Sequence, residues 1–140
     1  MTAKIPQKRH LSLIPPLLIA AIIFTFSSFG TDGSNAQSGF IVSIITSIFP
    51  TASNLDILTT IVRKSAHFLE YALLGFFTAR AFAAYNKHPA WAIPAGIVYA
   101  VTDELHQLFV SGRSCEITDV LLDSVGVTLG AATYMAFRKR

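Results

Sequence analysis

Apolar residues fill four long stretches of the chain, and short polar segments separate them. A helix needs roughly 20 residues to cross the ~30 Å hydrocarbon core of a bilayer. The pattern therefore predicts four membrane-spanning helices, over residues 11–29, 65–85, 90–109 and 117–137.

A fifth apolar run, at residues 40–49, is too short to cross a bilayer. Polar residues recur along and just after it at helical spacing: Ser43, Thr46, Ser47 and Pro50. Such a segment is typical of a helix that lies in the membrane interface or enters the bilayer and returns. Asn54 then predicts the N-cap of a helix that continues into the second span.

These patterns predict an all-α, polytopic membrane protein with one domain over residues 1–140. Its architecture is a four-helix transmembrane bundle, with an additional short interfacial or re-entrant helix between the first and second spans. Composition agrees, because 52% of the residues are hydrophobic and only 14% are charged. The basic stretch before the first span also resembles the start of a signal peptide. The apolar run that follows is longer than a usual signal core, which favours a membrane anchor.

Charge predicts the orientation of the helices. With four spans, most Lys and Arg residues fall on one side of the membrane, and only Arg63, Lys64 and Arg113 fall on the other. The positive-inside rule then places both termini in the cytoplasm. The net charge of +3 is explained by basic residues at helix ends, so we expect no nucleic-acid partner. All eight acidic residues lie in the outer half or beyond it: Asp32, Asp56, Glu70, Asp103, Glu104, Glu116, Asp119 and Asp123.

Charged and polar side chains gather near the outer ends of three spans. The second span carries Arg63, Lys64, His67, Glu70 and Tyr71 on one stripe. The third carries Asp103, His106 and Gln107 on one face, and Glu104 about 100° away. Asp119 and Asp123 lie on the fourth span, and Arg113 lies in the loop before it. A charge at the centre of a spanning helix costs about 2.5–3.5 kcal/mol, so such residues are functional by default.

Five of these carboxylates meet three fixed cations, so the surplus needs a proton, a protonated histidine, a metal ion or a cationic ligand. His67 with Glu70, and Asp103 with His106, form i, i+3 pairs that could act as general acid and base or bind a divalent cation. No motif specific for a metal or cofactor accompanies them. The other interpretation is that the charges only pair with one another and hold the bundle together.

Three sequence segments resemble the VanZ-like family of bacterial membrane proteins. They are RKSAHFLEYALLG at residues 63–75, TDELHQLFVSGR at residues 102–113 and TDVLLDSVGVTLG at residues 118–130. The resemblance implies a small integral protein of the bacterial cell (cytoplasmic) membrane. The founding member is associated with raised tolerance to the glycopeptide teicoplanin. Family positions carried over are Lys64, His67, Tyr71, Asp103, Glu104, His106, Gln107, Arg113 and Asp119. The loop departs from the family pattern at Ser111, Cys115 and Glu116.

Two hypotheses for function follow. In the first, an outward-facing polar site binds or processes the headgroup of a lipid or cell-wall precursor and affects glycopeptide susceptibility. Arg63, Lys64 and Arg113 would hold an anion, and Glu70, Asp103 and His106 would act as acid and base. The remaining members of the binding set are His67, Tyr71, Glu104, Gln107, Asp119 and Asp123. In the second hypothesis the protein is a non-catalytic scaffold. A proton-coupled transporter is less favoured, because the charges define no inward path.

Overall fold

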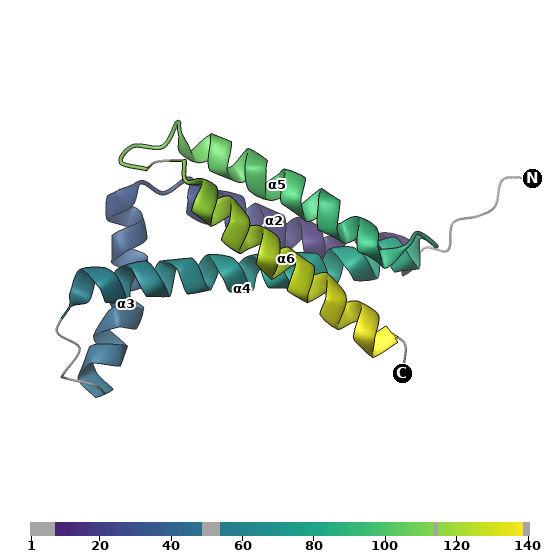
Figure 1. Ribbon diagram of the computed structural model, residues 1–140, viewed down its shortest axis with the longest axis horizontal. Helices are drawn as coiled ribbons and strands as arrows, with labels where there is room; N and C mark the ends of the chain where they lie inside the picture. Colours follow the sequence, from purple (N-terminus) through teal and green to yellow (C-terminus); the bar gives the residue numbers. More distant parts are fainter. Residues whose placement is uncertain (1–7, 49–53, 114, 139–140) are drawn as a thin grey trace, which may run out of the picture.

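The computed structural model describes residues 8–48, 54–113 and 115–138, and in this part of the chain it contains helices and no strand (Figure 1). The helices are α1 (Lys8–Leu11), α2 (Ile14–Ser27), α3 (Thr31–Ile48), α4 (Leu55–Ala84), α5 (Ala92–Gln107) and α6 (Ile117–Arg138). A short 3₁₀ helix, η1 (Pro89–Trp91), precedes α5. The all-α prediction is confirmed. Pro50, from the polar stripe expected after the first span, lies outside the described residues.

The longest helix is α4, which runs for 30 residues or about 45 Å. The side-chain oxygen of Asn54 accepts a hydrogen bond from the backbone N–H of Ile57 at 3.4 Å, so Asn54 caps the helix as predicted. From there the helix passes through Arg63 and Lys64 without a break. Both residues have good helix propensity, so the polar stripe and the apolar stretch that follows it can belong to one continuous helix.

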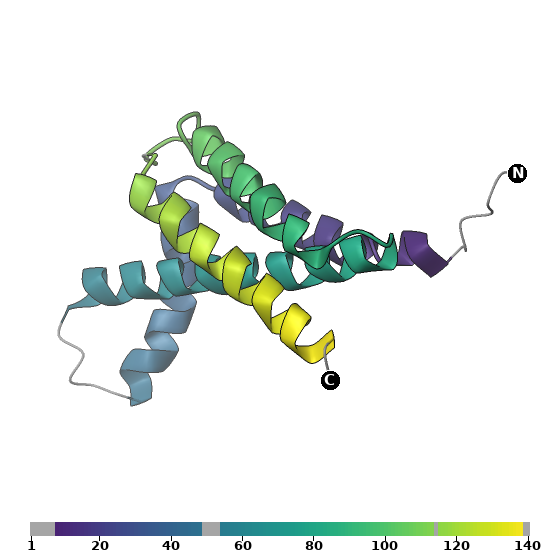
Figure 2. The ribbon, with the colours of Figure 1, turned by 45° about the vertical axis from the view of Figure 1, so that its right-hand side comes forward.

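The helix expected at residues 40–49 is longer than the apolar pattern indicated. It begins at Thr31, runs for 18 residues and crosses α4 at a steep angle (Figures 1 and 2). Packing against α4 offsets the low helix propensity of its polar first half, since Ser38 and Val42 are buried. The hydroxyls of Ser43, Thr46 and Ser47 donate to backbone carbonyls of α3 itself. The polar stripe is therefore satisfied within the helix.

Among the described residues, two segments are long and apolar enough to cross a membrane: Arg9–Ser27, which includes α2, and Ile117–Arg138, which is α6. Their mean hydropathy is 1.9 and 1.5. The other two expected spans lie in α4, which is charged in its first half, and in α5, which has only 16 residues. The structure thus supports a membrane protein, and the four-span bundle stays a prediction.

The order of the helix ends agrees with an up-and-down arrangement. At one end of the bundle, the Tyr85 hydroxyl at the end of α4 lies 3.3 Å from His10 Nδ1 in α1, and η1 contacts the last part of α6. At the opposite end, the Arg113 side chain reaches the Phe29 carbonyl just after α2. Figure 1 shows α2, α4, α5 and α6 alternating in direction between these two ends.

The closest helix pair is α4 with α6, and glycines allow their backbones to touch. A Cβ added at Gly130 would overlap the Ala72 carbonyl, and one added at Gly126 would come within 2.7 Å of the Phe68 carbonyl. The four-residue spacing of Gly126 and Gly130 places both on one face of α6, the small-residue pattern that lets helix backbones approach closely. The contact fixes the height of α6 along α4, and with it the relative positions of the charges above.

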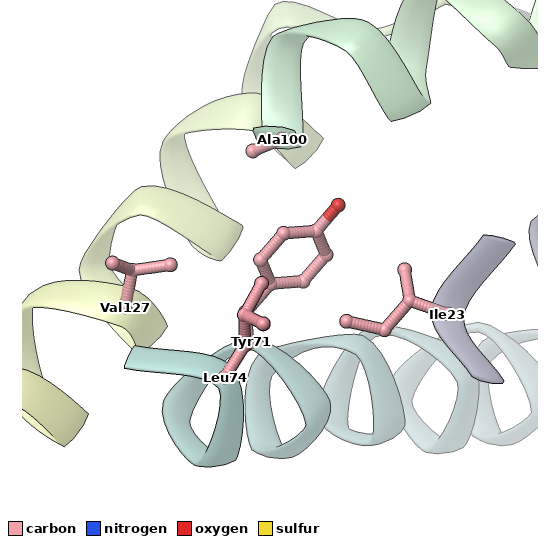
Figure 3. Packing of buried hydrophobic residues seen from close by; sticks show 5 residues of the cluster. All are labelled: Ile23, Tyr71, Leu74, Ala100 and Val127. Carbon is pink, nitrogen blue, oxygen red and sulfur yellow. The ribbon is translucent and has the colours of Figure 1, made fainter. Parts of the chain in front are cut away.

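The apolar core of the bundle lies beside the glycine contact (Figure 3). Ile23, Leu74, Ala100 and Val127 surround the ring of Tyr71, which is fully buried. In Figure 3 the Tyr71 hydroxyl points away from α4 into the space between α2 and α5. These contacts join four helices into one unit.

Candidate functional site

A cavity of about 120 Å³ lies at the end of the bundle where α5 turns into α6. We call it the polar cavity. Most of the binding residues predicted from the sequence line it: Arg63, Lys64, His67, Glu104, Gln107, Arg113, Asp119 and Asp123. Three further residues that were not predicted complete the lining: Gly112, Glu116 and Leu122. Helical periodicity thus indicated the sides of α4 and α6 that line this cavity, whereas on α5 the lining comes from Glu104 and Gln107 and not from the whole expected face.

An ion pair joins α4 to α6 across the polar cavity. The Lys64 ammonium contacts the Asp119 carboxylate directly and lies 3.5 Å from Glu116 Oε2. The three side chains are partly exposed, so the pair stabilises the fold by about 1 kcal/mol or less. Its main effect is to offset part of the negative charge at the start of α6, where one ammonium faces two carboxylates.

Glu104 links α5 to the start of α6. The side chain is only 2% exposed, and its Oε1 accepts a hydrogen bond from the Glu116 backbone N–H at 2.6 Å. In the sequence Glu116 was counted among the acidic residues of the outer half and as a departure from the family pattern, but not among the site residues. Its place just before α6 is the signal that could have identified it, because carboxylates are favoured at helix N-termini.

Asp103 lies in a buried hydrogen-bond chain behind the polar cavity. Its Oδ2 accepts from the Ser27 hydroxyl at 2.7 Å and from the Gln107 amide at 3.4 Å. Gln107 Oε1 in turn accepts from Arg113 Nη1 at 3.0 Å, so the chain runs from α2 through α5 to the loop. Asp103 is 3% exposed, and its Oδ1 has no hydrogen-bond partner among the described residues.

The acid–base set expected from the sequence does not form one cluster. His106 stacks on Phe24, with ring centroids 4.5 Å apart, and its Nε2 lies 3.1 Å from the Ser28 hydroxyl. Neither His106 nor Asp103 lines the polar cavity, and Glu70 lines a different one. One helical turn separates Asp103 from His106, but the two side chains meet different parts of α2. An acid–base role for these residues stays a prediction.

Tyr71, expected in the binding set, packs in the apolar core instead of lining the polar cavity. Its hydroxyl is buried without a hydrogen-bond partner among the described residues. The ring lies 6.1 Å from that of Tyr99, whose own hydroxyl donates to the Ala20 carbonyl at 2.6 Å. The sequence placed Tyr71 on the polar stripe of α4. Its position one residue past Glu70 turns it toward α2 and α5.

A second, larger cavity of about 530 Å³ adjoins the polar cavity, and we call it the cleft. Its lining comes from α2, α3, α4 and the loop: Phe26, Ser38, Ile41, Val62, Arg63, Ala66, His67, Glu70 and Arg113. Arg63, His67 and Arg113 line both spaces. Burial, and secondly the nearby guanidinium of Arg63, lower the pKa of Arg113, which lies in the loop outside the expected spans. Two guanidinium groups therefore lie close together where the polar cavity and the cleft meet.

Among the described residues, no three His, Cys, Asp or Glu side chains are grouped so that they could hold a metal ion. We therefore assign no metal ligands. The lone cysteine, Cys115, is exposed in the loop.

Comparison with known proteins agrees with the sequence motifs that line the polar cavity. No curated protein and no solved structure gives a significant match to the chain. A family model described as VanZ/LLP1 matches residues 13–138, a range that includes every helix from α2 to α6. All the residues of the polar cavity and the cleft fall within this range. The chain therefore belongs to the VanZ/LLP1 family.

Proposed function

We propose that this protein binds the headgroup of a lipid or a lipid-linked cell-wall precursor in its polar cavity. The observation that supports this most directly is the cavity itself, built from charged side chains of three helices at one end of the bundle. In the proposed topology four helices span the bacterial cytoplasmic membrane, both termini are cytoplasmic, and the polar cavity faces outward. Charged groups at the outer membrane surface then meet headgroups instead of hydrocarbon.

One wall of the polar cavity suits an anion. Among the described residues, no carboxylate lies within ion-pair distance of Arg63, although Arg63 lines both the polar cavity and the cleft. Arg113 lies close by, and its guanidinium is oriented by hydrogen bonds to Gln107 and to the Phe29 carbonyl. Guanidinium groups match the oxygens of phosphate and carboxylate in a bidentate manner. This wall would hold the negative group of the ligand.

The opposite wall suits hydrogen-bond donors. Asp123 is 3% exposed and lines the polar cavity, and its Oδ1 has no hydrogen-bond partner among the described residues. Glu104 lies beside it on the same cavity. Carboxylate oxygens that are buried without a partner cost free energy, which a hydroxyl or amine of the ligand would recover. A headgroup with both an anionic group and such donors therefore fits best.

A susceptibility assay tests the link between this site and the cell envelope. In a bacterial host, we expect the wild-type protein to raise tolerance to teicoplanin and Asp103→Asn to return it to the level of the empty vector. The new amide would face the Gln107 amide, which now donates to Asp103, so Gln107 and then Arg113 would shift.

Asp56→Asn is the matched control, because Asp56 is exposed near the start of α4 and lines neither cavity. Membrane abundance is measured in parallel for all variants. No tolerance from the wild-type protein would show that the glycopeptide effect does not apply to this chain. Equal loss of tolerance and of folded protein in Asp103→Asn would assign Asp103 a structural role only.

The scaffold alternative draws on the direct contact between Lys64 and Asp119, which joins α4 to α6. Lys64→Glu brings three carboxylates together and should lower both thermal stability and membrane abundance. Adding Asp119→Lys to it should restore both, because the pair re-forms with reversed sign. We expect tolerance to stay low in this double variant, since the swap reverses the charges presented to the ligand. Full recovery of tolerance would favour the scaffold.

A further inference from the structure

We propose that the ligand is a phosphate amphiphile whose single hydrocarbon chain lies in the cleft. Its phosphate would sit at Arg63 and Arg113, where the cleft meets the polar cavity. This inference rests on the proposed headgroup-binding function and specifies the class of ligand. The argument uses the shared wall of the two spaces, the lining of the cleft and its surroundings.

The polar cavity and the cleft form one continuous binding surface. Arg63, His67 and Arg113 face both, so a ligand held by these residues would contact both at once. On the side of the polar cavity lie the carboxylates of α5 and α6. On the side of the cleft most of the lining surface is apolar, although five of the nine lining residues are polar. A molecule that fills both must therefore be polar at one end and apolar at the other.

The cleft suits a hydrocarbon chain. Phe26 from α2, Ile41 from α3, and Val62 and Ala66 from α4 give it apolar walls. Its volume of about 530 Å³ falls within the range of about 300–1,000 Å³ that is typical of ligand pockets. α3 crosses α4 at a steep angle (Figure 2), and its Ser38 and Ile41 contribute to the lining of the cleft.

Phosphate is favoured over carboxylate as the anionic group. Two guanidinium groups and one imidazole converge at the junction, and a phosphate offers three terminal oxygens to them where a carboxylate offers two. Glu70 is the one carboxylate among the described residues of the cleft. It follows Arg63 by seven positions on α4, or about 10 Å along the helix axis. Glu70 thus bounds the apolar part of the cleft instead of opposing the phosphate.

Photo-crosslinking tests the position of the chain. The full-length protein is placed in phosphatidylcholine nanodiscs with hexadecyl phosphate that carries a diazirine at mid-chain. A control probe has the same chain with a trimethylammonium head. We expect peptides from α3 and α4 that line the cleft to be labelled about tenfold more by the phosphate probe, because charge-assisted hydrogen bonds retain only the anionic head.

Two alanine-to-phenylalanine substitutions test whether the hydrocarbon chain of the ligand lies in the cleft. Ala66→Phe fills the cleft and should remove the enrichment. Ala21→Phe adds the same ring on the exposed face of α2, outside the cleft, and should keep it. Equal labelling by the two heads in the wild-type protein would overturn the inference, as would enrichment that survives Ala66→Phe.

A separate measurement distinguishes this inference from the proposed function. Glycerol 3-phosphate carries the head without a long chain, and its binding to the wild-type protein is followed by calorimetry. Binding of glycerol 3-phosphate without head-dependent labelling of the cleft would overturn the chain position and leave the headgroup function standing. Absence of both would overturn the two proposals together.

Discussion

Gly130→Ala should destabilise the protein by about 2–3 kcal/mol, the upper part of the usual range for overpacked cores. The added methyl group would overlap the Ala72 carbonyl, and backbone atoms on both helices cannot move aside without shifting α6 along α4. A flexible side chain at that position would relax more cheaply. We expect a lower melting temperature in detergent and less folded protein in the membrane.

Gly39→Ala is the matched control. A Cβ at Gly39 meets no atom within 4 Å, and Gly39 lies within α3. This substitution should be neutral or stabilise the protein by about 0.4–1 kcal/mol, because alanine loses less chain entropy on folding. Equal melting temperatures for the two variants would contradict the close approach of α4 and α6.

Arg63→Ala should weaken binding of glycerol 3-phosphate about 10- to 100-fold, which corresponds to the loss of a charged hydrogen bond of about 1.5–3 kcal/mol. Thermal stability should change little, because among the described residues no carboxylate pairs with Arg63 in the absence of ligand. Arg63→Lys should bind with intermediate affinity, since an ammonium keeps the charge but lacks the planar fork. Calorimetry measures the affinity of the wild type, Arg63→Ala and Arg63→Lys for glycerol 3-phosphate.

Arg80→Ala serves as the control for charge, because Arg80 is exposed near the far end of α4 and lines neither cavity. Its affinity for glycerol 3-phosphate should match that of the wild type. If Arg63→Ala instead lost folded protein and kept its affinity, Arg63 would be a structural residue and the anion would bind elsewhere.

Apolar length and helix-terminus chemistry predicted much of the fold. The expected fourth span starts at the same residue as α6, and Asn54 caps α4 as its side chain suggested. The first half of α3 could not be predicted in this way, because its residues are polar and poor helix formers. Its helical state depends on packing against α4, which local propensity does not include.

Helical periodicity predicted which residues share one face of a helix, but it could not predict which side chains of other helices they contact. It identified the sides of α4 and α6 that line the polar cavity, but on α5 the cavity is lined by Glu104 and Gln107 and not by Asp103 or His106. It could not show that Asp103 meets Ser27 while His106, one turn later, meets Phe24 and Ser28. Which helix lies opposite each side chain depends on tertiary packing. The pairing of Glu104 with a loop N–H was also beyond a pattern of side chains.

The loop between α5 and α6 bears on the route by which a ligand would reach the polar cavity. The Glu104 carboxylate holds the backbone of Glu116 at one end of this loop, and Arg113 is tied to α2 through the Phe29 carbonyl. Entry from the aqueous side by lifting the loop would break both contacts. Entry through the cleft breaks neither. In the proposed topology, a lipid ligand would diffuse sideways from the bilayer into the protein without leaving the membrane.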